Sequence, residues 1–344
     1  MTIELFTLNV SHFLQASSLM NVRKIISSKS KGDEKMISLL FGAGASFGAE
    51  LHKPVPPLGN NLFDKLVELG GAFSELPDDI KQEFRLHGFE KGMLSIPNDS
   101  RVINPLQKEI AKYLSSFKPS NENAYVRLFR SLREYAKHVN VITLNYDLLI
   151  EHAMLMSGAQ KVSYGLDANE QNYSVLKVHG SANFVPVLAP NVIFEGNVSI
   201  GCGAFIETNQ ILSLNSHEEI IKWCDSRQNS DLSPIMCMYN KEKRVVINPK
   251  YLESKRKEYA DVVSNTKTLI IVGVKYIAHD NHIWDVILDS APELIIVDPY
   301  PSEEFLLLLQ QRNITHTLMR DSFYKSVLKL SLYIRNRVKI YPQI

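Results

Sequence analysis

Short runs of apolar residues recur along the chain, and each ends at glycine or at polar side chains. The run at 36–41 stops at Gly42, and the run at 139–144 stops at Asn145. Runs of this length between turn residues are typical of strands buried on both faces of a parallel sheet. The strands expected on this basis cover residues 36–41, 139–144, 175–178, 268–273, 293–298 and 314–318.

The segments between these runs show the spacing of apolar positions that is typical of helices. The clearest lies at 121–138, where Tyr125, Leu128 and Leu132 fall on one helical face. Strands that alternate with helices predict an α/β fold, here a Rossmann-like doubly wound parallel sheet. Further helices are expected at 59–69, 147–156, 302–312 and 322–334.

Changes in this pattern suggest that the chain is divided into unequal parts. Residues 1–35 are expected to form a helical arm and linker, which either contacts another subunit or packs on its own domain. The main domain covers 36–335 and includes a helical insertion at 75–138 that covers the cleft. Irregular signals at 186–262 indicate a second small module or a long insertion, and 336–344 are expected to form a C-terminal tail.

The composition is that of an ordinary globular protein. Of 344 residues, 45% are hydrophobic and 22% are charged, and this length is ample for a sizeable core. Lys and Arg number 38 against 37 Asp and Glu, a net charge of +1. This balance argues against a strongly basic nucleic-acid binder, although a local basic patch stays open.

The cysteines and the start of the chain narrow the class further. Cys202, Cys224 and Cys237 are far apart and no Cys-x-x-Cys pair exists, so neither a zinc ribbon nor a disulfide framework is expected. Residues 1–10 include Glu4 and have no basic segment before their apolar residues, unlike a signal peptide. No apolar run approaches the roughly 18 residues of a membrane span. We therefore expect a cytoplasmic protein with reduced thiols and no membrane contact.

A glycine-rich turn follows the first expected strand, with the sequence Gly42-Ala43-Gly44-Ala45-Ser46. Glycines let the backbone approach a diphosphate closely, and the amides of such a turn can point at the anion. A strand, a glycine turn and a helix in this order indicate a nucleotide-binding unit. A tight turn without a ligand is the alternative.

Polar residues also follow the next two strands. Asn145 and Asp147 come after 139–144, and His179 comes after 175–178. If these strands run parallel, the three side chains lie along one cleft edge, where ligands bind in such sheets. Two alternatives stay open: Asp147 caps the following helix, and His179 is a satisfied structural histidine.

These segments, in this order, resemble the sirtuin superfamily, and the resemblance is closer to the bacterial SIR2-like domains of anti-phage defence than to the protein deacetylases. The resemblance spans roughly residues 36–320. The segments that carry it are Gly42-Ala43-Gly44-Ala45-Ser46, Thr143-Leu144-Asn145-Tyr146-Asp147 and Val178-His179-Gly180-Ser181, followed by 246–250 and 273–283.

The resemblance implies an NAD+ site. In it, the glycine turn lines the diphosphate and nearby ribose, Asn145 and Asp147 hold the nicotinamide ribose and order water, and His179 is the base. A developing ribosyl cation, a positioned nucleophile and a base near neutrality are what this chemistry requires. The residues expected to bind NAD+ are Gly42, Ala43, Gly44, Ser46, Gly180, Ser181, Gly273, Lys275, Asp280 and Asp298.

The chain departs from the family's pattern at two points. Lys275 stands where the family usually has serine, and a lysine there could reach a phosphate as a point charge. The paired cysteines of the deacetylase zinc module are absent, so water is the expected acceptor. Asp280 and His282 after a strand suggest a metal or a base, with capping by Asp280 as the alternative. Asp298 either touches an adenine ribose or forms a cap or turn.

The resemblance therefore implies an NAD+ glycohydrolase that releases nicotinamide and ADP-ribose without a metal. The expected role is a bacterial anti-phage defence effector that depletes NAD+. Such an enzyme must be held inactive, so a homo-oligomer or an activating or inhibitory protein partner is expected. The alternatives are an NAD-dependent protein deacylase or ADP-ribosyltransferase, and a non-catalytic NAD or ADP-ribose sensor subunit.

Overall fold

The computed structural model describes residues 37–97, 99–166, 172–188, 206–208, 210–237 and 247–340. Contacts between residues divide the chain into two units, 1–34 and 35–344, and all described residues belong to the second. The expected N-terminal arm, Cys202 and the last residues, 341–344, lie outside the described residues.

The core of the described unit is a six-stranded sheet in which every strand is parallel to its neighbours. The chain starts at the central strand β1, moves outward through β2 to β5, and then returns beside β1 as β8 and continues through β9 to β10. This confirms the prediction of a doubly wound parallel sheet. The strands are β1 (Ile37–Phe41), β2 (Val139–Thr143), β5 (Leu176–Lys177), β8 (Thr268–Val272), β9 (Glu293–Val297) and β10 (His316–Met319).

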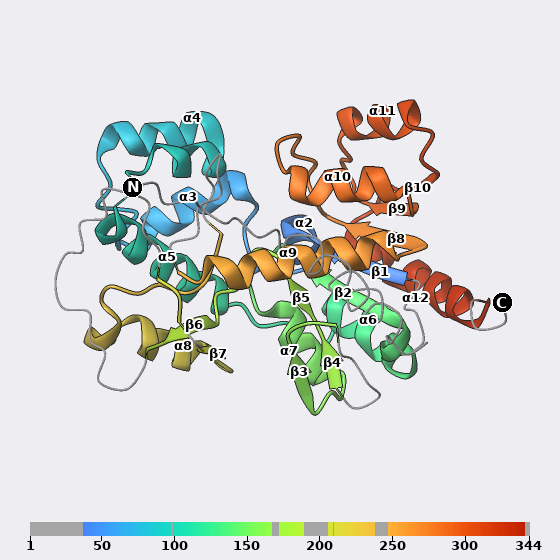
Figure 1. Cartoon of the computed structure of the whole chain (residues 1–344), viewed down its shortest axis with the longest axis horizontal. Coiled ribbons are helices and arrows are strands. Elements are labelled where there is room, and N and C mark those ends of the chain that lie inside the picture. Colours follow the sequence, from blue (N-terminus) through green and yellow to red (C-terminus); the bar gives the residue numbers. More distant parts are fainter. Residues whose placement is uncertain are drawn as a thin grey trace, which may run out of the picture. The chain divides into compact units, whose positions relative to one another are not determined.

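The central strands are mostly apolar because helices cover both faces of the sheet (Figure 1). Leu39 and Phe41 belong to one core cluster and Leu40 to the other, since successive side chains of a strand point to opposite faces. The first cluster includes residues of α6 (Ala124–Leu132), α7 (Leu149–Met156) and α12 (Phe323–Ile340); the second includes residues of α9 (Pro249–Ser264), α10 (Asn281–Ser290) and α11 (Glu303–Gln311).

This topology places the site at one edge of the sheet. The order of the strands reverses between β1 and β8. In open parallel sheets, ligands bind outside the carboxyl ends of the strands at such a reversal. The loops that follow β1, β2, β5 and β8 are therefore the best placed to contact a ligand.

Helices occupy most of the expected insertion at 75–138. They include α4 (Asp78–Ser95) and α5 (Ser100–Ser115), which pack with the preceding α3 (Gly59–Glu68). Phe63 of α3 stacks on Phe84 of α4, with ring centroids 4.3 Å apart. The expected helix at 121–138 is an α-helix to Leu132 and a 3-10 helix over Arg133–His138.

The expected small module at 186–262 has a core of its own. It contains the antiparallel pair β6 (Phe184–Val187) and β7 (Gln210–Ser213) and the helix α8 (His217–Cys224). Helix α9 begins in this core with Leu252 and ends in the core of the sheet with Val263. A boundary at 262 therefore falls inside a helix that joins both parts. A short parallel pair, β3 (Lys161–Ser163) with β4 (Asn172–Ser174), was not expected from the sequence.

The last helix is longer than predicted. α12 continues to Ile340 rather than ending near Ile334, so most of the expected tail at 336–344 is helical. The physical reason is that the apolar spacing continues: Leu330, Ile334 and Val338 are all buried.

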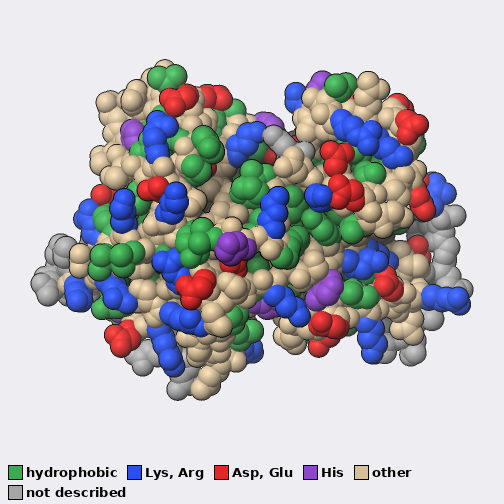
Figure 2. Space-filling view, turned by 180° about the vertical axis from the view of Figure 1, so that it is seen from behind, with side chains coloured by type: hydrophobic (Ala, Val, Ile, Leu, Met, Phe, Trp, Pro, Cys, Tyr) green, Lys and Arg blue, Asp and Glu red, His purple; other side chains and the backbone are tan. Residues whose placement is uncertain are grey.

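The surface matches the near-zero net charge. Figure 2 shows Lys and Arg side chains interspersed with Asp and Glu over the face that it displays. In the part of the chain that the structure describes, no helix has the length and apolar character needed to span a membrane.

Candidate functional site

The glycine turn after β1 packs tightly against the loop after β8. The Gly42 amide donates to the carbonyl of Val272 at 3.0 Å, and the Gly44 amide donates to that of Gly273 at 2.9 Å. A Cβ at Gly42 would lie 2.6 Å from the carbonyl oxygen of Gly273, which itself has a φ of 58°. These contacts require glycine without any ligand, and they engage two amides that were expected to face a diphosphate.

Ser46 of the short helix α2 (Ala43–Phe47) is the centre of a buried polar network. Its hydroxyl donates to Asp147 Oδ2 at 2.8 Å and accepts from Asn145 Nδ2 at 2.9 Å. The Tyr125 hydroxyl lies 3.2 Å away. A hydroxyl has one hydrogen and two lone pairs, so these partners use its full capacity. Asn145 Nδ2 also donates to the Gly42 carbonyl at 2.9 Å.

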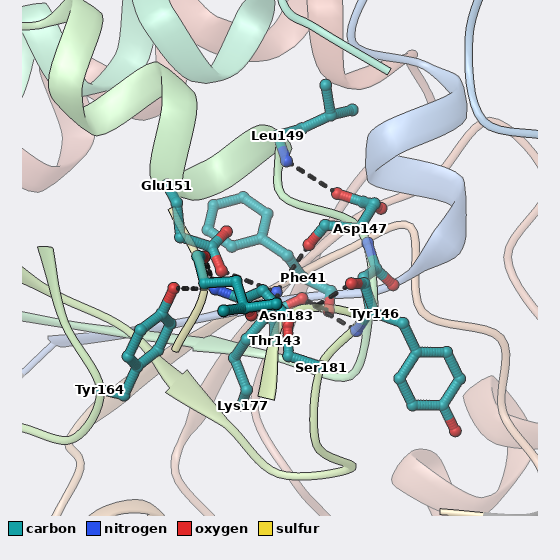
Figure 3. Close-up of polar contacts among 12 residues, drawn as sticks. Phe41, Thr143, Tyr146, Asp147, Leu149, Glu151, Tyr164, Lys177, Ser181 and Asn183 are labelled. Atoms are coloured by element: carbon teal, nitrogen blue, oxygen red, sulfur yellow. Dashed lines mark hydrogen bonds and ion pairs between the residues drawn. The ribbon is translucent and has the colours of Figure 1, made fainter. Parts of the chain in front are cut away.

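Asp147 has two roles in this arrangement. One carboxylate oxygen accepts from the Ser46 hydroxyl, and the other accepts from the Leu149 amide at 3.1 Å. Figure 3 shows the contact between Asp147 and Leu149. The contact with the Leu149 amide lies at the first residue of α7, where the sequence offered capping by Asp147 as an alternative. Burial raises the pKa of the Asp147 carboxyl, and the nearby charge of Lys177 opposes that shift.

Lys177 holds a second buried network that the sequence analysis did not identify. Its ammonium donates to the Asp147 carbonyl at 2.6 Å, to Glu151 Oε1 at 2.8 Å and to Ser181 Oγ at 2.8 Å. Figure 3 shows these groups converging from β5, α7 and the intervening loops. Ser181 was expected to contact NAD+, but its hydroxyl is bonded to this lysine. The sequence feature that could have revealed this network is a lysine, Lys177, within the otherwise apolar strand at 175–178.

His179 follows β5, whose pairing with β2 is parallel, as expected. The imidazole is 8% exposed, and its Nε2 lies 3.0 Å from Nε2 of His282 in the first turn of α10. One of the two nitrogens must carry the hydrogen, so the pair fixes complementary tautomers or shares an added proton. Gly180 has a φ of 84°, and a Cβ there would lie 2.1 Å from the Ile235 carbonyl oxygen. Its glycine is therefore required by packing.

A cavity of about 100 Å³ lies at the carboxyl edge of the sheet. Its polar lining includes Ser46, Asn145 and Asp147. His179 is not among the residues that line this cavity. Small-molecule sites typically measure about 300–1,000 Å³, so this cavity is small for a dinucleotide. The apolar lining includes Ala43, Pro56, Pro57, Leu62, Phe89, Ile110, Leu114 and Leu144.

The remaining expected contacts lie in the loops after β8 and β9. Lys275 is exposed. Asp280 is buried at the N-cap position of α10, but its side chain makes no capping hydrogen bond. Asp298 Oδ1 accepts from the Tyr300 amide at 2.8 Å, which is the turn that the sequence left as an alternative.

The described thiols and acidic groups show no arrangement for a metal. Cys224 and Cys237 are buried thiols that are not joined in a disulfide, and Nη2 of Arg256 donates to Cys237 Sγ at 3.3 Å. Within the described ranges, no group of three or more His, Cys, Asp and Glu side chains could hold a metal ion.

Comparisons with known proteins give similarity in structure only. No family profile matches the sequence, and no curated protein matches it. One similar solved structure is a Sir2 homologue mutant in complex with ADP-ribose, at 14% identity and a TM-score of 0.45, covering 92% of this chain and 98% of that chain. Another is a Sir2 homologue in complex with NAD, at 15% identity and a TM-score of 0.43, covering 92% of this chain and 94% of the other.

Proposed function

We propose that the chain binds NAD+ at the carboxyl edge of the sheet and hydrolyses the bond between nicotinamide and ribose. The observation that carries this proposal is the buried network of Ser46, Asn145 and Asp147, which lines the cavity. The residue types match those that the resemblance to sirtuins implied. The parallel pairing of β2 with β5 also supports a common edge for Asn145 and His179.

The cavity suits the nicotinamide end of NAD+. Its lining combines many apolar side chains with the amide of Asn145, the hydroxyl of Ser46 and the carboxylate of Asp147. The buried Asp147 carboxylate would stabilise positive charge that develops on the ribose as the bond breaks. Such a charge is stabilised more strongly in a water-poor site than in bulk solvent.

The proposed reaction needs no general acid. The bond between C1′ and the ring nitrogen breaks, and its electron pair neutralises the pyridinium. A water oxygen forms the new bond to C1′ and loses a proton, which the His179 imidazole would accept. The products are nicotinamide, ADP-ribose and one proton, so atoms and charge balance.

The described state is closed in this proposal. The cavity is smaller than a dinucleotide needs, and Nε2 of His179 is already paired with His282. Binding of NAD+ would therefore require the loops after β5 and β8 to separate. That requirement suits the role proposed from the resemblance, a bacterial defence effector kept inactive until an oligomer or a partner protein triggers it.

The test is nicotinamide release from NAD+ by the full chain, alone and with candidate partners, combined with calorimetric binding of NAD+. We expect His179→Ala and Asn145→Ala to abolish release while each variant stays folded, with a lower thermal midpoint for Asn145→Ala because the Gly42 carbonyl and Ser46 lose a buried partner. Undiminished turnover in both variants would remove these residues from the mechanism.

A second candidate is a subunit that binds NAD+ or ADP-ribose without cleaving it. The position of His179 outside the cavity favours this alternative. It predicts saturable binding of NAD+ with no nicotinamide release under any triggering condition. Deacylation or ADP-ribosyl transfer would instead form product only when an acceptor protein is present.

A further inference from the structure

Lys177 is the most deeply buried charged side chain near the proposed site. Its side chain is 0% exposed and that of its partner Glu151 is 6% exposed. The three hydrogens of the ammonium are all used, by a backbone carbonyl, a carboxylate and a hydroxyl. The mechanism proposed above assigns no role to this network.

The network joins the two loops that carry the proposed catalytic residues. The Asp147 carbonyl belongs to the loop after β2, between Asn145 and the first turn of α7. Ser181 belongs to the loop after β5, two residues beyond His179. Lys177 therefore links both loops through a single nitrogen atom, as Figure 3 shows.

We propose that Lys177 is a positioning residue, which fixes the loop of Asn145 and Asp147 against the loop of His179. This inference rests on the proposed function. Lys177 does not touch the substrate in this role. It sets the distance between the amide and carboxylate on one side and the imidazole on the other, and such distances control rate strongly.

Lys177 also acts on the charge of Asp147. Its ammonium lowers the pKa of this carboxyl, against the effect of burial, and Glu151 raises it more weakly. The other groups that face Asp147 are the Ser46 hydroxyl of α2, the Leu149 amide of α7 and the Tyr125 hydroxyl of α6. Loss of Lys177 and Glu151 together should therefore raise the pKa of Asp147.

A purely structural role for the ion pair is a weaker account. Replacement of a buried ion pair by apolar side chains of similar volume is often neutral or stabilising, whereas removal of one partner is strongly destabilising. The fold does not need this ion pair for stability if a matched apolar pair can fill its place. An apolar pair cannot hold the two loops by hydrogen bonds, and it cannot place a positive charge near Asp147.

The experiment compares three variants of the full chain with the wild type. The double variant Lys177→Met with Glu151→Leu removes the network but fills its volume. The control is Lys255→Met with Glu258→Leu. It removes an ion pair on α9 that has the same 2.8 Å separation but is only partly buried. Ser181→Ala removes one acceptor of the Lys177 ammonium and keeps the ion pair.

Three quantities are measured for each protein: the thermal midpoint, the kcat and KM for nicotinamide release against pH, and the titration of Asp147. Carbon-13 labelling of aspartate carboxyls reports this titration, and Asp147→Asn assigns the signal. For the Lys177 and Glu151 double variant we expect a near-normal midpoint and a kcat lowered roughly tenfold to hundredfold. The acid limb of activity and the Asp147 titration should both move to higher pH, and the control should show neither change.

A folded double variant with the kcat and Asp147 titration of the wild type would overturn the proposal. If the double variant does not fold, Ser181→Ala decides, because an unchanged kcat together with an unchanged titration would also overturn it. Failure of the proposed function looks different. A wild type that releases no nicotinamide under any triggering condition, with an upward titration shift in the double variant, would retain the effect of Lys177 on Asp147 and reject the hydrolase.

Discussion

At the scale of single residues, the site is defined by hydrogen bonds that leave little unsatisfied. Ser46 bonds to Asn145 and Asp147 and lies against Tyr125, and Lys177 satisfies three acceptors. Buried polar groups are costly to leave without partners. Single substitutions that leave one of these buried groups without its partner should therefore affect both stability and activity, and each effect needs its own measurement.

Ser46→Ala tests the first network. We expect a loss of about 1–3 kcal/mol in the free energy of unfolding, because Asn145 and Asp147 each lose a buried partner. Nicotinamide release should also fall. Urea unfolding and the release assay measure the two effects. Ser254→Ala is the matched control, since the Ser254 hydroxyl bonds only a carbonyl of its own helix at an exposed position; an equal loss there would contradict the prediction.

Asp147→Asn tests the pH dependence of stability. Burial raises the pKa of Asp147 in the folded protein, so the protonated form is favoured by folding. The stability that this group contributes is present below its unfolded pKa of about 3.9 and is lost as pH rises through the higher folded value. The stability of the wild type relative to Asp147→Asn should therefore fall with rising pH across that window. Urea unfolding at several pH values measures it; a relative stability that rises with pH would contradict the sign.

At the scale of elements, Gly180 marks a close contact between the loop after β5 and the small module. Gly180 forms an isolated antiparallel bridge with Met236. The Cys237 amide donates to the His179 carbonyl at 2.9 Å, and the Ser181 amide donates to the Ile235 carbonyl at 3.0 Å. Residues 235–237 therefore hold the backbone around His179 from the side opposite the sheet.

Gly180→Ala measures how much this contact contributes. Both Gly180 and Gly70 have positive φ, but a Cβ at Gly70 would meet nothing within 4 Å. We expect Gly70→Ala to cost about 1–2 kcal/mol from backbone conformation alone. Gly180→Ala should cost clearly more, because its Cβ would overlap the Ile235 carbonyl. Equal losses of the free energy of unfolding in the two variants would show that residues 235–237 can move away freely.

At the scale of the whole described unit, side chains from both halves of the sheet come into contact at the carboxyl ends of the strands. His179 follows β5 and His282 begins the helix after β8, and these strands lie on opposite sides of β1 and β2. Their contact therefore crosses the ends of the central strands, where the nucleotide is proposed to bind.

His282→Ala should make ADP-ribose binding tighter. Loss of one hydrogen bond lowers the cost of opening by about 0.5–1.5 kcal/mol, which corresponds to an affinity gain of up to roughly tenfold. Isothermal titration calorimetry with ADP-ribose measures this directly. Weaker binding would show that His282 contacts the ligand rather than closes the cleft. His316→Ala is a suitable control, because His316 bonds the carbonyl of Ile314 near the edge strand β10.

The sequence by itself determined the strands, the parallel sheet and the position of Asn145, Asp147 and His179 at strand ends. These features follow from local periodicity, because a strand buried on both faces must be apolar throughout and must end where polar residues begin. The bounds of the sheet strands differ from expectation by only one or two residues at each end. The last helix was longer than expected, since its final buried residue, Val338, lies beyond the segment taken as helical.

Only the tertiary structure decided which polar groups meet. Ser46 and Asp147 are 101 residues apart in sequence, and His179 and His282 are 103 apart. Local periodicity carries no information on such partners, because each is set by the order in which strands join the sheet. The same holds for Gly180 and Lys177, whose roles depend on the small module and on the loop after β2. The sequence located the edge of the sheet where chemistry is expected, and the packing of distant segments fixed which atoms face one another there.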